Sequence, residues 1–264
     1  MRRFLPELIA LPLLPFLIAQ GRRARRLTPR LPEATGPCMG LAGNAEGSPP
    51  ISLLTVGESP VAGVGVTTHE EGITGQLARA LSAHFKRPVS WRACGKNGVT
   101  AYEALEQILP SIPAKPVDIA LIAFGVNDTT AFRSVSRWRA DLRNVVEALE
   151  QRCAPRLILL SGVPPLANFP ALPQPLRWVM GLKAQALDVA ARELATTLPR
   201  TRYVALALDA SDPALMASDG YHPSAKGCTA WAQLLTQGCL PDWHFGQTGG
   251  EDSRTTAARM DDVR

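Results

Sequence analysis

Short apolar runs alternate with segments of helical periodicity over most of this chain, and this alternation limits its fold more than any other feature. The apolar runs, each interpreted as a strand, cover residues 51–56, 89–94, 117–124, 157–161 and 203–208. Apolar residues recur every three or four positions, the period of a helix, over residues 74–85, 101–109, 137–152, 176–197 and 224–237. We therefore expect an α/β fold in which a five-stranded parallel sheet is covered by helices on both faces.

The loops that follow these strands carry the polar residues of greatest interest. Right-handed crossovers bring such loops to one edge of a parallel sheet, where ligands of these folds bind. Ser59 follows the first strand, Gly98 ends a Gly-Lys-Asn-Gly loop after the second, and Asn127 follows the third. Asp219 and His222 stand in a turn after the fifth strand. Four segments distant in sequence are thus expected to converge on one site.

The residue types in these loops predict nucleophilic catalysis. A serine hydroxyl is a weak nucleophile until a base removes its proton, and imidazole suits that task because its ordinary pKa of about 6.5 lies near neutral pH. Asp219, three residues before His222, is placed to orient the ring and stabilise its charged form. Candidate donors to the oxyanion of a tetrahedral intermediate are the backbone N–H groups of Ser59 and Gly98 and the side-chain amide of Asn127. We predict Ser59, Asp219 and His222 as the catalytic set.

In this order and spacing, the same residues resemble the four blocks of the SGNH hydrolases, also called GDSL-type esterases and lipases. Ser59 in Val-Gly-Glu-Ser resembles the first block, and Gly98 resembles the second. Asn127 in Gly-Val-Asn-Asp resembles the third block, and Asp219 with His222 the fourth, so the resemblance covers about residues 51–240. The resemblance implies that the chain folds as a flavodoxin-like three-layer α/β/α sandwich. It also implies that the protein cleaves ester bonds.

Three positions qualify this resemblance. The family usually has Asp before the serine, whereas this chain has Glu58, from which we expect a change in loop packing and not in the chemistry. The glycine of the second block is either Gly95 or Gly98, and Gly98 is preferred because a boundary between a loop and a helix follows it. Val61 stands where a Gly-x-Ser-x-Gly frame would need its second glycine, which argues against the α/β-hydrolase fold.

The N-terminus combines an apolar stretch with arginines on both sides. Residues 5–19 are apolar except for Glu7 and three prolines, and an arginine cluster at positions 22–26 follows. A secretory signal peptide is one interpretation, but no small-x-small cleavage site is evident. We favour an uncleaved membrane anchor over residues 1–26, either a short span or an interfacial segment. The arginines would then hold the following domain in the cytoplasm, whereas a cleaved signal would make it periplasmic or secreted.

The rest of the chain divides simply. We expect a Pro/Gly-rich linker at residues 27–50, the hydrolase domain at residues 51–240 and a disordered tail at residues 241–264. The formal net charge of +5 comes largely from the arginines of the first thirty residues, so no nucleic-acid-binding stripe is indicated. Five cysteines without a C-x-x-C pair, and the absence of an H-E-x-x-H motif, predict neither a metal site nor a cofactor.

A proline-rich loop at residues 164–178 follows the fourth strand and therefore lies at the same edge of the sheet. It is interpreted either as an apolar wall for the acyl group or as a packed structural loop. Its candidate substrate-binding residues are Leu166, Phe169, Leu172 and Trp178.

These features favour a serine esterase for short-to-medium acyl esters, including lysophospholipid-like esters or thioesters. The alternatives are an acyltransferase or carbohydrate deacetylase of the same fold, or an inactive membrane-tethered binding protein. A sugar-binding groove usually displays aromatic side chains, and only 6% of this chain is aromatic. We expect a small-molecule or lipid ester as substrate, membrane contact through the N-terminus and no nucleic-acid partner.

Overall fold

A computed structural model describes residues 5–44 and 48–239. Its centre is a six-stranded sheet in the order β1-β3-β2-β4-β5-β6, in which β1 runs antiparallel to β3 and all other pairs are parallel. The strands are β1 (Met39–Ala42), β2 (Ile51–Gly57), β3 (Val89–Gly95), β4 (Ile119–Ala123), β5 (Leu157–Ser161) and β6 (Thr201–Val204). The expected parallel α/β sheet is thus confirmed, with one additional antiparallel strand.

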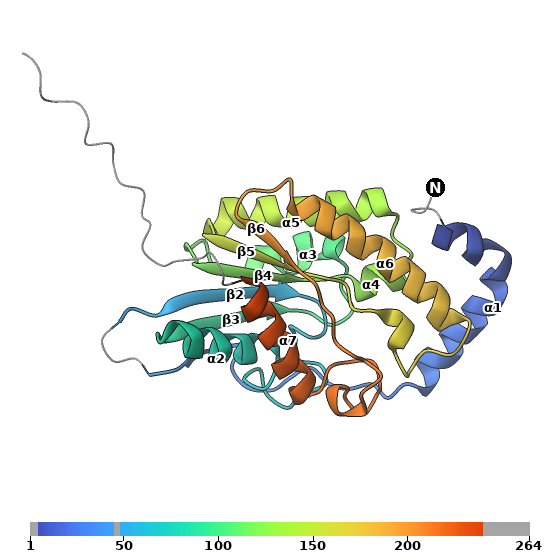
Figure 1. Cartoon of the computed structure of the whole chain (residues 1–264), viewed down its shortest axis with the longest axis horizontal. Coiled ribbons are helices and arrows are strands. Elements are labelled where there is room, and N and C mark those ends of the chain that lie inside the picture. The colour runs from blue at the N-terminus through green and yellow to red at the C-terminus, as the bar shows by residue number, and fades with distance from the viewer. Residues whose placement is uncertain (1–4, 45–47, 240–264) are drawn as a thin grey trace, which may run out of the picture.

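Helices cover both faces of this sheet, and Figure 1 shows α5 and α6 on one side with α2 and α7 on the other. The helices are α1 (Leu5–Leu27), α2 (Ile73–Phe85), α3 (Ala101–Gln107), α4 (Val126–Thr130), α5 (Val135–Cys153), α6 (Leu176–Ala195) and α7 (Ala225–Cys239). Three short 3-10 helices span Leu109–Ser111, Leu166–Asn168 and Pro213–Leu215. This arrangement is the three-layer α/β/α sandwich expected from the sequence.

The strands explain why the chain forms two cores. All five residues of β4 and all five of β5 are buried, as expected for strands with helices on both faces. Along them, side chains alternate between the two cores: Ile122 and Leu160 face the core under α5 and α6, and Leu121 and Leu159 face the core under α2 and α7.

Two boundaries differ from the sequence prediction. The stretch 27–50, expected as a linker, contains β1, a short edge strand with only Ala42 buried. The final strand was expected over residues 203–208, but β6 pairs with β5 only over Thr201–Val204. Both strands lie at sheet edges, where half-exposed residues leave a weak apolar pattern. The expected tail at residues 241–264 lies outside the described residues.

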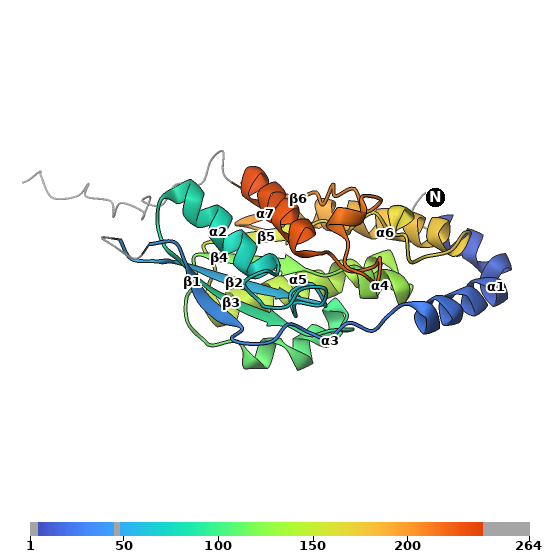
Figure 2. The same cartoon turned by 90° about the horizontal axis from the view of Figure 1, so that it is seen from below.

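The N-terminal apolar stretch forms α1, which packs against α6 at the end of the molecule (Figures 1 and 2). Pro12 and Pro15 lie inside this helix. Within the described ranges, no helix has both the length and the apolarity that crossing a membrane requires.

Candidate active site

The register of three central strands brings the predicted loops together. Gly57, the last residue of β2, lies opposite Gly95 of β3 and Ala123 of β4, so all three strands end at the same level. A side chain at Gly57 would collide with the carbonyl oxygen of Ala123, because an added Cβ would lie 2.4 Å from it. The residues that follow each strand therefore enter one region beyond the carboxyl edge of the sheet.

Ser59, His222 and Asp219 form a continuous chain of hydrogen bonds in this region. His222 Nε2 lies 3.0 Å from Ser59 Oγ, and His222 Nδ1 lies 2.6 Å from Asp219 Oδ2. The second oxygen of Asp219 accepts the backbone N–H groups of Tyr221 and His222 at 2.9 and 3.0 Å. This geometry allows His222 to take the serine proton while Asp219 fixes the orientation of the ring.

The ionisation of Asp219 suits this arrangement. Burial alone would raise the pKa of its carboxyl, but hydrogen bonds from the His222 ring and from two backbone N–H groups lower the pKa below its usual value. Asp219 is therefore a carboxylate at neutral pH, able to stabilise a charged imidazole next to it.

Asn127 lies in the first turn of α4, and Gly98 lies in the loop between β3 and α3. The Asn127 side-chain amide donates to the carbonyl oxygen of Val99 at 2.9 Å, which holds the amide group in place. Gly98 is exposed and has a φ of +81°, a conformation that favours glycine. Gly95 instead belongs to β3, where an added Cβ would lie 2.3 Å from the backbone nitrogen of Ala62. Gly98 therefore has the positive φ of a loop glycine. Gly95 is a strand residue where a side chain would collide with the backbone of Ala62.

Glu58 connects the loop that carries Ser59 to the start of α4. Its carboxyl accepts the backbone N–H groups of Val126 and Asn127 at 2.8 and 2.9 Å. Burial raises the pKa of Glu58 to about 8, and nearby Asp128 acts in the same direction, while the backbone hydrogen bonds act against them. The Glu58 carboxyl thus holds the start of α4 next to the loop that carries Ser59.

Asp128 is a further buried carboxyl that the sequence did not single out. One of its oxygens accepts the backbone N–H of Ala101 at 3.2 Å, which connects α4 to the start of α3. Burial raises the pKa of Asp128 to about 7. Its only signal in the sequence is its position directly after Asn127.

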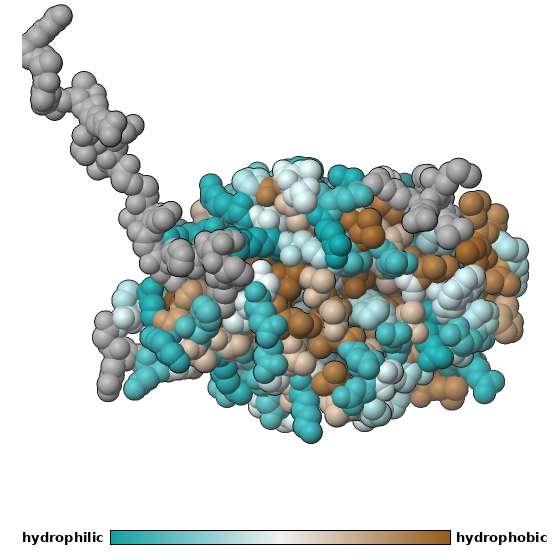
Figure 3. Space-filling view, viewed as in Figure 1, coloured by the Kyte–Doolittle hydropathy of each residue, from teal (hydrophilic) through white to brown (hydrophobic). Residues whose placement is uncertain are grey.

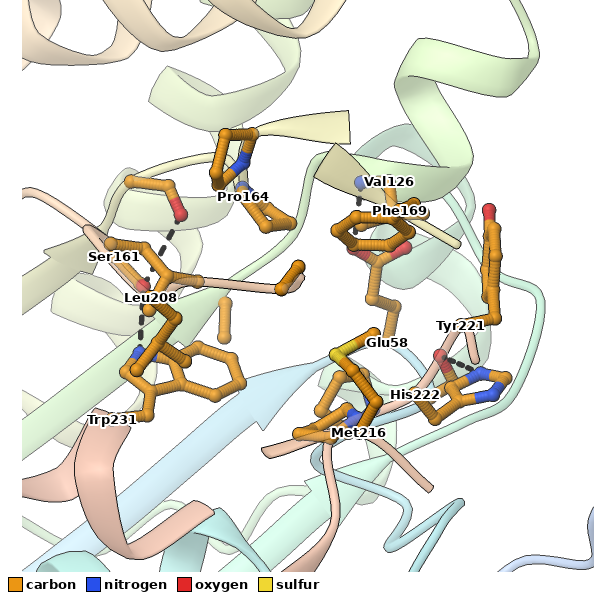
Figure 4. A pocket seen from close by; sticks show the side chains of 18 of the residues that line it. Glu58, Val126, Ser161, Pro164, Phe169, Leu208, Met216, Tyr221, His222 and Trp231 are labelled. Carbon is orange, nitrogen blue, oxygen red and sulfur yellow. Dashed lines mark hydrogen bonds between the residues drawn. The ribbon is translucent and has the colours of Figure 1, made fainter. Parts of the chain in front are cut away.

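Two cavities adjoin Ser59 and His222. A narrow one of about 60 Å³ lies behind them, between the sheet and α7, and Figure 4 shows Phe169, Met216 and Leu208 around it. A wide cleft of about 1030 Å³ opens on the other side and is also lined by Asn127. α1 forms one wall of this cleft, a role that the sequence did not predict.

The structure separates the four candidate substrate-binding residues. Leu172 lines the wide cleft and Phe169 lines the narrow cavity. Leu166 is fully buried in the core, and Trp178 is half exposed on α6, where it lines neither space. Over residues 5–44 and 48–239, no group of three His, Cys, Asp or Glu side chains is placed to hold a metal ion.

Comparisons with known proteins identify the family of this chain. Residues 55–230 match the model of the GDSL-like Lipase/Acylhydrolase family. A GDSL-like esterase of Mycobacterium tuberculosis is 27% identical over 191 residues, which are 70% of this chain and 60% of that protein. The chain thus spans about three fifths of the length of this curated relative.

Solved structures of similar fold include a lipase from a goat rumen metagenome, with a TM-score of 0.54 and 17% identity over 72% of this chain and 97% of the lipase. An extracellular lipase from Streptomyces rimosus matches with a TM-score of 0.52 and 14% identity, over 71% of this chain and 99% of that one. The family match covers most of the chain and includes every loop that supplies the site. The chain therefore belongs to the GDSL-like lipase/acylhydrolase family.

Proposed function

We propose that this protein hydrolyses carboxylic esters through an acyl-enzyme formed on Ser59. The observation that carries the proposal is the hydrogen-bonded chain from Ser59 Oγ through the His222 ring to Asp219. Ser59 Oγ attacks the ester carbonyl as its proton passes to His222 Nε2, and the intermediate expels the alcohol, which takes that proton. Water, deprotonated by His222, then attacks the acyl-enzyme and releases the acid and the free serine.

The oxyanion of each tetrahedral intermediate requires fixed donors. We assign this role to the backbone N–H groups of Ser59 and Gly98 and to the side-chain amide of Asn127. The hydrogen bond to Val99 uses one proton of the Asn127 amide, which leaves the other for the substrate. Because these donors are held by the surrounding backbone, they need little reorganisation when charge develops.

The two cavities differ in the substrate that they fit. The wide cleft brings Ser59, His222 and Asn127 to one wall and Leu172, Leu176 and other apolar side chains to another. The narrow cavity is far smaller, about 60 Å³ against about 1030 Å³, so we assign to it only a very short group. We place the acyl chain in the wide cleft, which favours short-to-medium acyl esters over acetylated sugars.

Labelling of the serine tests the mechanism. A fluorophosphonate probe should label the full chain at Ser59, and the protein should hydrolyse p-nitrophenyl butyrate. Ser59→Ala should lose both, whereas Ser136→Ala, which removes an exposed hydroxyl on α5, should lose neither. A folded Ser59→Ala protein with full activity would disprove the assignment.

A series of p-nitrophenyl esters tests the acyl preference. We expect kcat/KM to rise from acetyl to butyryl and longer chains, because each buried CH₂ contributes about 0.8 kcal/mol. A strict preference for acetyl esters, together with cleavage of acetylated oligosaccharides, would favour the carbohydrate deacetylase instead.

We further propose that α1 brings the protein to a lipid surface. Leu8, Leu11 and Phe16 are more than half exposed, and Figure 3 shows apolar residues gathered at the end of the molecule that α1 forms. Four arginines of α1, at positions 22, 23, 25 and 26, would attract anionic headgroups. Full-length protein should sediment with vesicles containing phosphatidylglycerol, and replacement of Leu8 and Phe16 by Ser should weaken this binding.

A further inference from the structure

Helix α1 is fastened to α6 by polar contacts at two points. Glu7 forms an ion pair with Lys183, whose side chain is fully buried on α6. Two turns before the end of α1, the Gln20 amide donates to the Gln174 carbonyl oxygen at 2.7 Å and accepts the Leu176 N–H at 3.1 Å. A buried lysine is expensive unless it has a partner, so this pair specifies where the helix rests.

One stripe of the docked helix faces the wide cleft beside Ser59. Residues of α1 that line the cleft recur at helical spacing: Leu11, Leu14, Ile18, Arg22 and Arg25. The first three are apolar, and Leu11 and Ile18 lie seven positions apart, or about 10 Å along the helix. The stripe therefore changes from apolar to cationic along its length.

The opposite wall of the cleft matches the apolar part of this stripe. It contains Phe132 after α4, Leu172 before α6, and Leu176 and Met180 on α6. The same space reaches Ser59 and His222. An acyl chain attached to Ser59 would thus have apolar side chains on two sides, one of them supplied by α1.

The charges in the cleft do not balance. Its described acidic and basic residues other than His222 are Glu7, Arg22, Arg25, Arg30 and Asp219, and the Tyr221 phenol also lines it. Both carboxylates already have partners, because Glu7 pairs with Lys183 and Asp219 binds His222 and two backbone N–H groups.

No hydrogen bond or ion pair joins Arg22, Arg25 or Arg30 to another described side chain. Burial raises the pKa of the Tyr221 phenol, and the positive charge of Arg25 acts in the opposite direction. Tyr221 directly precedes His222, so the charge of Arg25 influences the turn that carries the catalytic histidine. The cleft that reaches Ser59 thus carries three arginines that have no described side-chain partner.

From this arrangement we infer that α1 is the substrate-selecting wall of the active site, and that Arg22 and Arg25, with Arg30, recognise an anionic group on the alcohol part of the ester. This inference rests on the proposed ester hydrolysis at Ser59. The preferred substrate class is an acyl ester whose alcohol bears a phosphate or a similar anion. Arginine suits such groups because its planar guanidinium donates two parallel hydrogen bonds.

A matched pair of substrates tests the inference. Monooctanoylglycerol and octanoyl lysophosphatidic acid share an acyl chain, and only the second is anionic. Full-length protein is assayed with each one below its micelle-forming concentration and without vesicles. We expect kcat/KM to be about tenfold or more higher for the anionic ester, and this ratio to fall as salt screens the arginines.

Variants of α1 locate the selectivity. Arg22→Ala combined with Arg25→Ala should lower the ratio about tenfold or more, as expected for the loss of charge-assisted hydrogen bonds. Arg26→Ala removes a charge from the same helix at an exposed position that lines none of the cavities beside α1, and it should leave the ratio unchanged. Circular dichroism of each variant confirms that it is folded.

The outcomes separate this inference from the proposed function. Equal ratios in the parent and in the double variant would overturn the selectivity while leaving ester hydrolysis intact. A ratio that falls as much in Arg26→Ala would show that total charge, and not the cleft, is responsible. If Ser59→Ala hydrolyses monooctanoylglycerol as well as the parent does, the proposed function itself fails.

Discussion

The catalytic edge and the α1 wall border the same cleft but are built differently. At the edge, Ser59 and Asp219 are buried, and every polar atom of the Asp219 carboxyl has a partner. On the wall, Leu11 and Leu14 are 71% and 46% exposed. The helix is held to α6 by buried Ala10 and Leu17 and by polar contacts at two points. The edge is thus fixed by the sheet, whereas the wall depends on a few contacts between segments far apart in sequence.

This difference assigns different tasks to the two regions. Catalysis requires donors and acceptors held in place before the substrate arrives, which the strand ends and tight turns provide. Selection among acyl chains and headgroups tolerates a looser surface, because apolar contact is not directional. Changes at the edge should therefore affect the rate for every ester, while changes on the wall should affect the choice of ester.

The largest effect is expected at Asp219. In Asp219→Asn the amide nitrogen would face His222 Nδ1 and favour the wrong tautomer of the ring, although the other contacts of the side chain could remain. We expect kcat to fall about 10⁴-fold for neutral and anionic esters alike. Asp209→Asn changes an exposed carboxylate in the preceding connection and is the matched control. An Asp219→Asn protein with undiminished kcat would remove Asp219 from the mechanism.

A smaller loss is expected at Asn127. Asn127→Ala removes one proposed oxyanion donor and the hydrogen bond to Val99, but it leaves the serine and its base in place. We expect kcat to fall about 10²- to 10³-fold with a smaller change in KM. Asn144→Ala, on the exposed face of α5, controls for the loss of an amide elsewhere. A change confined to KM would instead indicate a role in binding alone.

The catalytic edge could be located from the sequence because its signals are local. The first two apolar runs are each followed by a glycine and a charged residue, Gly57-Glu58 and Gly95-Lys96, and parallel strands place such ends together. Asp219 and His222 lie three residues apart in one turn, so their proximity does not depend on the rest of the fold. The Glu58 contact with the start of α4 was not predictable, since it joins residues 68 and 69 positions apart.

The α1 wall could not be derived in this way. Its apolar residues and arginines fit contact with a membrane as well as contact with protein, and the prolines gave no reason to expect a continuous helix. Its position depends on a pair between Glu7 and Lys183, which are 176 residues apart. Strand β1 was missed for a related reason, because a four-residue edge strand with one buried side chain has no distinct pattern.

The pH dependence of stability tests how firmly the edge is built. Because burial raises the pKa of Glu58 to about 8 from an ordinary value of 4.5, its stabilising neutral form is fully present below pH 4.5 and is lost as pH rises through 8. Between these values, stability should fall by up to about 1.4 kcal/mol per pH unit for this one group.

Urea unfolding at a series of pH values between 5 and 8.5 measures this slope. Glu58→Gln should make the decrease of unfolding free energy with pH smaller. Part of the decrease should remain, because burial also raises the pKa of Asp128, to about 7. Glu106→Gln, at an exposed position of α3, should keep the parental slope. A parental slope in Glu58→Gln as well would show that Glu58 is ionised in the folded protein throughout this range.

The smallest effect is expected where the wall is fastened, at the pair between Glu7 and Lys183. Glu7→Gln leaves the buried ammonium without its carboxylate, and Lys183→Met leaves Glu7 beside an apolar side chain. Because the Glu7 side chain is about one third exposed, we expect each single change to weaken α1 docking by only about 1–2 kcal/mol. The double variant Glu7→Leu with Lys183→Met should regain docking, since apolar replacement of a buried pair is often neutral or stabilising.

Hydrogen exchange of the α1 amides measures docking, and hydrolysis of butyryl and octanoyl esters measures its consequence. Both single variants should keep activity on the butyryl ester, which needs little of the wall, and lose activity on the octanoyl ester. Equal loss on both esters would mean that α1 supports the catalytic edge itself, and the division of tasks between the two regions would have to be abandoned.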